Sequence, residues 1–146
     1  MQQAMHDLIT PRVLSPAQID ALKKELKDFP NTPFDLAVTD DPDARNLVMQ
    51  IGELLKDAGW SWKAASNMGN AVVFTMKDRP QVAVVSAYGL SIELAISVKP
   101  TLEKPAVTLL NGLLRSGIKA TATAAPDDKF LSEMDKNNIH IFVGKR

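Results

Sequence analysis

The segment between residues 33 and 65 restricts the fold more than any other part of the sequence. Pro33–Thr39 is a short β-prone run, and a long stretch with apolar residues at helical spacing follows it. Asp41 and Pro42 suit the cap and the first position of that helix, and Gly59 suits its end. A second β-prone run comes next. A strand–helix–strand unit joins parallel strands, so this segment predicts an α/β fold.

Similar signals recur on both sides of this unit. Ser15 and Gln18 form a capping box for an N-terminal helix, which Pro30 ends. A third helix is expected over about 101–117, with Pro105 in its first turn. The β-prone runs beyond the first are 60–65, 71–76, 82–87, 91–97, 118–124 and 139–143, and a polar loop or short helix is expected at 126–138.

Alternating helices and strands predict a sheet that is covered by helices. We expect one α/β domain over residues 12–146, with a mixed or largely parallel sheet of about five strands. The close alternative is a βαββαβ two-layer sandwich, which arises if strands at 61–66 and 91–97 pair as a hairpin. Residues 1–11 lack the basic and apolar regions of a signal peptide, and they suggest a flexible tail or the cut edge of a longer protein.

The charge balance and the missing cysteines exclude several function classes. The 146 residues include 17 Lys and Arg and 17 Asp and Glu, so the formal net charge is zero. Nucleic-acid binders concentrate cations, and nucleic acid is therefore not an expected partner. Without cysteine there is no disulfide, thiolate zinc site or cysteine nucleophile. No apolar run approaches the roughly 20 residues that span a bilayer, so membrane contact would need segments outside this chain.

An acidic loop is the first candidate site. Asp40, Asp41 and Asp43 follow a predicted strand at its carboxyl end, where open α/β sheets bind ligands, and Arg45 belongs to the same loop. Two interpretations are open. The carboxylates cap the following helix and compensate its dipole. Alternatively, they bind a small ligand or a divalent cation, with Asp40 and Asp41 as the metal ligands.

Two tryptophans form the second candidate. Trp60 and Trp62 share one face of the second predicted strand, because side chains on a strand repeat every two residues. Such a pair either packs in the core under a helix or forms a pocket or partner surface, since aromatic residues dominate binding hot spots.

The sequence contains no recognisable catalytic constellation. His6 lies in the N-terminal tail, and His140 is expected to be a solvated or edge-strand residue. No serine lies in a nucleophile motif, and no glycine-rich phosphate loop is present. The balance therefore favours a protein that is not an enzyme, and no cofactor is predicted beyond the divalent cation considered above. The alternative is a small-molecule enzyme that uses the three carboxylates of the acidic loop.

The run 36–45 resembles the first strand and acidic pocket of response-regulator receiver domains. The resemblance implies magnesium at Asp40 or Asp41, a phosphoacceptor at Asp78 and a switch Lys-Pro at 99–100. Three features oppose it. The five residues between two neighbouring β-prone runs are too few for a covering helix, which needs about 10. A helix precedes the first strand, and two further strands follow the last expected helix.

A second resemblance extends over nearly the whole chain. Residues 12–18, Phe29-Pro30, Asp43-Ala44, 58–60 and the ending 139–146 are similar to a domain near the C-terminus of bacterial membrane-anchored proteins of unknown function. The resemblance implies a soluble domain that follows transmembrane helices outside this chain, and it carries no catalytic residues.

The sequence therefore favours a non-catalytic sensing, regulatory or assembly module of a membrane-anchored bacterial protein. A protein partner or self-association would serve such a role. The compartment stays open, with the cytoplasmic side of a membrane as one option.

Overall fold

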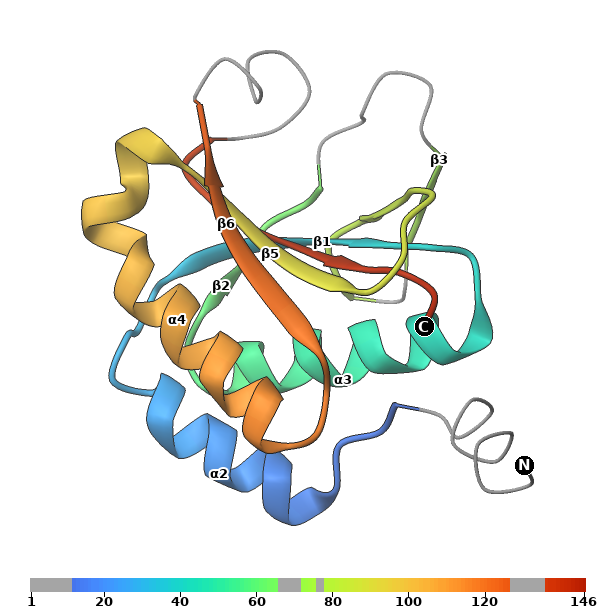
Figure 1. The fold of residues 1–146 in the computed structure, drawn as a ribbon, viewed down its shortest axis with the longest axis horizontal. Coiled ribbons are helices and arrows are strands. Elements are labelled where there is room, and N and C mark those ends of the chain that lie inside the picture. The colour runs from blue at the N-terminus through green and yellow to red at the C-terminus, as the bar shows by residue number, and fades with distance from the viewer. Residues whose placement is uncertain (1–11, 66–71, 76–77, 127–135) are drawn as a thin grey trace.

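The computed structural model describes residues 12–65, 72–75, 78–126 and 136–146. Figure 1 shows a twisted sheet with helices packed against it. The helices are α2 (Pro16–Leu26), α3 (Pro42–Asp57) and α4 (Lys99–Arg115), and the short 3-10 helix η1 (Ile96–Val98) leads into α4. The strands are β1 (Pro33–Val38), β2 (Ser61–Trp62), β3 (Val72–Phe74), β4 (Val82–Val84), β5 (Leu90–Ala95), β6 (Ala120–Ala125) and β7 (Ile139–Val143).

The sheet is mixed, with the strand order β3-β4-β1-β7-β5-β6, and β2 is a short additional strand beside β1. β1 is parallel to β2, β4 and β7, and β5 is parallel to β6. β3 and β4 are antiparallel, as are β5 and β7. The predicted α/β class with a mixed sheet is confirmed. The hairpin alternative does not occur, because β2 pairs with β1 while β5 pairs with β6 and β7.

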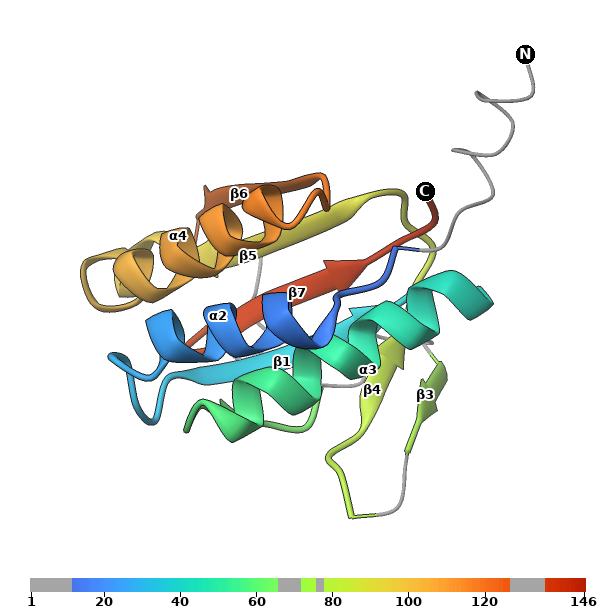
Figure 2. The same cartoon turned by 90° about the horizontal axis from the view of Figure 1, so that it is seen from below.

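The helices α2, α3 and α4 of the described residues all lie on one face of the sheet, as Figure 2 shows. The strand residues that face them are apolar and almost completely buried, and the apolar stripes of α2, α3 and α4 complete the same core. Burying these side chains removes apolar surface from water, which is the main favourable term in folding. The central strand residues of this core are Phe34, Leu36, Val38, Leu90, Ile92, Ile139, Ile141 and Val143.

Several predicted boundaries need correction. α4 begins at Lys99, so Pro105 lies inside the helix and not in its first turn. The strand expected at 60–65 is shortened to two residues, because β2 pairs only with the start of β1 while β4 pairs with Ala37 and Val38 at its end. Two short strands thus share one edge of β1. Most of the expected loop or helix at 126–138, residues 1–11 and His6 lie outside the described residues.

Arg12 joins three distant parts of the chain. Its guanidinium donates to the Asp43 carboxylate at the start of α3, with Nε and Oδ2 2.7 Å apart, and to the Gly144 carbonyl after β7 at 2.6 Å. The backbone near the first described residue therefore lies against the end of the last strand. None of the helices in the described part is long and apolar enough to cross a membrane.

Candidate functional site

Each carboxylate of the acidic loop has a partner within the protein. Asp41 is the N-cap of α3, and its Oδ2 accepts from the Ala44 amide at 3.0 Å. Asp43 is held by the backbone and side chain of Arg12. Asp40 forms an exposed ion pair with Arg45 at 2.8 Å. The capping interpretation accounts for this geometry. Within the described residues, no group of three His, Asp or Glu side chains is arranged to hold a metal ion.

Trp60 belongs to the core, and Trp62 is partly buried and packs against it. Trp60 is buried, and its indole nitrogen donates to the Leu26 carbonyl at 3.1 Å. The Phe34 ring packs against both indoles, with its centroid 6.2 Å from that of Trp60 and 5.8 Å from that of Trp62. The Trp62 ring also packs directly on Gly52 of α3, where a larger side chain has no room. Both tryptophans thus join α2 and α3 to β1, and the packing interpretation holds.

A buried polar cluster lies on the opposite face of the sheet, which none of the described helices covers and which we call the helix-free face. Asp35 Oδ1 and His140 Nδ1 are 2.8 Å apart, and the Asn138 amide donates to Asp35 Oδ2 at 3.1 Å. All three residues are buried, with His140 only 1% exposed. The expectation of a solvated or edge-strand histidine is wrong, because β7 is a central strand between β1 and β5.

Strand register extends this cluster into a row across the sheet. Asp35 is the partner of His140, His140 of Glu93, and Glu93 of Thr123, so the four residues share the helix-free face. A carboxylate bound to Nδ1 fixes the tautomer and orientation of an imidazole, as it does beside catalytic and metal-binding histidines. The row supplies such an oriented histidine, and no group of three His, Asp or Glu side chains in the described part of the chain is arranged to hold a metal ion beside it.

The sequence contains a partial signal for this cluster. Asp35 and His140 each interrupt an apolar strand, and each lies on the face opposite the large aliphatic side chains. A polar residue in a run that is otherwise buried needs a partner. The identity of that partner depends on the pairing of β1 with β7, which no local pattern reveals.

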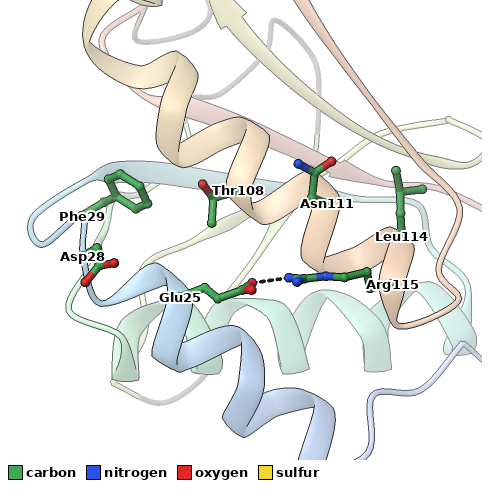
Figure 3. Close-up of a pocket in the computed structure, with 7 residues that line it drawn as sticks. All are labelled: Glu25, Asp28, Phe29, Thr108, Asn111, Leu114 and Arg115. Carbon is green, nitrogen blue, oxygen red and sulfur yellow. Dashed lines mark hydrogen bonds and ion pairs between the residues drawn. The ribbon is translucent and has the colours of Figure 1, made fainter.

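A shallow groove lies between α2 and α4 on the helix layer. Figure 3 shows side chains from the two helices on either side of it, with the ion pair between Glu25 and Arg115 across it. The hydrogen bond to Glu25 raises the pKa of the Arg115 guanidinium above its ordinary value. Leu114 is 47% exposed in this groove. The groove has a volume of about 620 Å³ and is lined by Glu25, Asp28, Phe29, Thr108, Asn111, Leu114 and Arg115.

A second groove runs between α4 and the edge strand β6. Its volume is about 210 Å³, and its walls include Ala106 and Val107 of α4 and Ala122 of β6. The space exists because β6 carries only alanine and threonine, which are too short to fill the gap beneath the helix. Neither groove is predictable from the sequence, since each depends on which elements become neighbours.

Comparison with known proteins identifies no relative: no protein-family model, no curated protein and no solved structure matches the chain. The class that the geometry itself defines is a mixed α/β sheet with helices on one face, a buried polar row on the other and an exposed edge strand. In receiver domains the helices cover both faces of a parallel sheet, which differs from the mixed sheet and the one-sided arrangement of the described helices.

Proposed function

We propose that this chain is a non-catalytic sensing, regulatory or assembly domain of a membrane-anchored bacterial protein, with assembly as its main role. We further propose that it binds its protein partner through the outer edge of β6. The resemblance of residues 12–60 and 139–146 to the C-terminal domain of such proteins supports the membrane-anchored origin. The exposed β6 edge supports assembly.

The single observation that carries this proposal is that β6 is an exposed edge strand without charged residues or proline. The strand pairs with β5 along all six of its residues, and it ends the strand order of the sheet. Residues 121–124 are all exposed, and the strand contains no charge and no proline. Proteins usually protect such edges with charged residues, proline, bulges or a covering segment, since an open edge offers backbone donors and acceptors to another chain.

The neighbouring groove strengthens this proposal. A strand added to a sheet edge gains affinity from main-chain hydrogen bonds and specificity from pockets for alternate side chains. The groove between α4 and β6 lies along the edge, so it can receive side chains from an added strand. The alternative enzyme based on the acidic loop has less support, because Asp41 and Asp43 already hold the start of α3.

The tether is tested by the codons upstream of Met1 in the native gene. We expect them to encode one or more stretches of roughly 20 apolar residues, as membrane-spanning helices require. Their absence, together with a native full-length protein that stays in the soluble fraction of lysed cells, would contradict the membrane-anchored origin. It would leave the role of the β6 edge to be judged by the next experiment.

Site-specific photocrosslinking tests the β6 edge. A photoreactive amino acid placed at Thr121 or Thr123 of the full chain, expressed in its native cells, should give protein adducts. The same amino acid at Asp20 or Lys24 serves as the control, because both are exposed on α2 and remote from β6. Adducts from β6 alone support the proposal. No adduct from β6, or equal yields at all four positions, would contradict it.

A further inference from the structure

We infer that the partner of β6 is the β6 strand of a second copy of this chain, paired antiparallel about a two-fold axis that passes between the two copies of Thr123. This inference rests on the proposed function and names the partner for the same edge. Closed two-fold dimers are the commonest oligomers, and they require a surface that is complementary to itself.

Geometry limits the registers that are available. A two-fold axis perpendicular to the sheet keeps the helix layers of both copies on one side, so residues that face each other must share a face. Ala120, Ala122 and Ala124 align with core-facing residues of β5, whereas Thr121 and Thr123 align with the helix-free face. Two residues that face each other in the antiparallel pair therefore have residue numbers with an even sum. The two-fold axis then passes midway between the two copies of one residue.

The side chains of β6 match in the register centred on Thr123. Thr123 then faces its own copy, Ala122 faces Ala124, and Thr121 faces Ala125. Threonine pairs across strands are favourable, and no two large or like-charged side chains meet. The strand contains only alanine and threonine, so the two copies can approach without steric conflict.

The groove beside β6 adds apolar contact to the seam. Val107 is 40% exposed on α4, and it borders the groove together with Ala106 and Ala122. A two-fold axis through the middle of β6 brings the grooves of both copies to one seam, where Val107 loses contact with water. The groove rim also carries Lys99 and Glu103, an exposed pair of opposite sign. Each copy therefore has one positive and one negative side chain at the rim of the groove.

The first experiment measures the mass of the full chain in solution over a wide range of concentrations. We expect a monomer at the lowest concentrations and a dimer at the highest, since a strand seam of this size suits a weak interface. Thr123→Lys should abolish the dimer because two ammonium groups then face each other across the axis. Asn46→Lys, at an exposed site on α3, is the matched control and should dimerise like the wild type.

Two further arms test the register itself. Thr123→Lys and Thr123→Asp should each stay monomeric alone and associate when mixed, because residue 123 faces residue 123. Since the chain contains no cysteine, Thr123→Cys introduces a single thiol, which should form an intermolecular disulfide under mild oxidation. Thr121→Cys should not, because the two copies of residue 121 lie roughly 13 Å apart in this register.

The outcomes separate the inference from the function on which it rests. A wild-type chain that is monomeric at every concentration, or a Thr123→Lys variant that dimerises normally, overturns the self-pairing. If the photocrosslinked adduct then has the mass of a different protein, the β6 edge remains the assembly site and only the identity of the partner is wrong. If β6 gives no adduct at all, both proposals fail.

Discussion

At the scale of single residues, the Asp35 carboxylate stands out because both of its oxygens have buried polar partners. His140 Nδ1 lies 2.8 Å from one oxygen, and the Asn138 amide donates to the other at 3.1 Å. The three side chains come from β1, β7 and the turn before β7, so the cluster links the two central strands on the helix-free face. Burial makes each of these contacts costly to lose, because water does not replace the missing partner.

Asp35→Ala should therefore lower the free energy of unfolding by about 1–3 kcal/mol, the usual cost of a buried polar group left without its partner. Urea unfolding at neutral pH measures the change. Asp20→Ala is the matched control, because Asp20 is exposed on α2 and forms only a surface ion pair with Lys23. Equal effects from the two substitutions would show that the cluster contributes nothing special to stability.

The ion pair between Glu53 and Arg79 predicts a pH dependence. Arg79 donates to both Glu53 oxygens, with distances of 2.6 and 3.0 Å. This hydrogen bonding lowers the pKa of Glu53 in the folded protein, although burial opposes the shift. The stabilisation is present above the ordinary pKa of a glutamate and is lost as the pH falls through the lowered folded value.

Glu53→Gln should consequently unfold at a lower urea concentration than the wild type at neutral pH, and the difference should shrink at acidic pH. Asp28→Asn is the control, because Asp28 is exposed and is not among the charges that act on Arg79, and its urea midpoint should follow the wild type at both pH values. A difference between Glu53→Gln and wild type that stays constant from neutral to acidic pH would rule out this linkage.

Site residues with a local role and site residues with a partner distant in the sequence differ in how far the sequence could predict them. Asp41 has a local role, since a residue before Pro42 at a helix start caps that helix, and the structure bears this out. The alternation of 139–143 correctly separates His140 from the isoleucines beside it. Whether its face is buried depends on the position of β7 in the sheet, and Asp35 lies 105 residues away in the sequence. Periodicity contains no information about such a contact.

At the scale of elements, the contact between α2 and α4 depends on a glycine. Gly112 lies within α4, and the place that its Cβ would occupy is filled by the Leu22 side chain of α2. Both positions are buried in the core. The small residue thus lets the two helices approach closely, and it brings Glu25 and Arg115 into contact at the groove.

Gly112→Ala should destabilise the fold by about 1–3 kcal/mol, because a methyl group is forced into a packed contact. In an exposed helix the same change would stabilise by up to about 1 kcal/mol, so the expected sign is the opposite of helix propensity. Thermal unfolding measures it, with Asn111→Ala as the control at the neighbouring exposed position. A more stable Gly112→Ala protein would show that Leu22 moves aside freely.

Helix ends were more predictable than strand lengths for a physical reason. Ser15 and Asp41 act within one turn of the chain, and both caps occur where the sequence indicates them. Strands end where their partners end, and β2 stops after Trp62 because β4 occupies the rest of the β1 edge. Pro105 misled the prediction of α4, since proline is typical of a first turn but here lies inside the helix.

At the scale of the whole molecule, the one-sided helix layer separates two surfaces. The helices α2, α3 and α4 cover one face (Figure 2). The strand register places Asp35, His140 and Glu93 on the other face. The strand order brings β7, the last strand in sequence, between β1 and β5. The central pairing therefore forms only once almost the entire chain has been made, and contacts that are this distant in sequence slow folding.

The contact between Arg12 and the Gly144 carbonyl has a consequence for the connectivity of the chain. Since the two ends of the described fold touch, a short glycine linker from Arg146 to Arg12 should close the backbone into a ring without strain. New termini can then open between Pro30 and Asn31, which are exposed in the connection after α2. This circular permutant should fold cooperatively with the circular dichroism spectrum of the parent. A permutant that unfolds without a cooperative transition would mean that α2 packs against the sheet only when the elements are joined in their natural order along the chain.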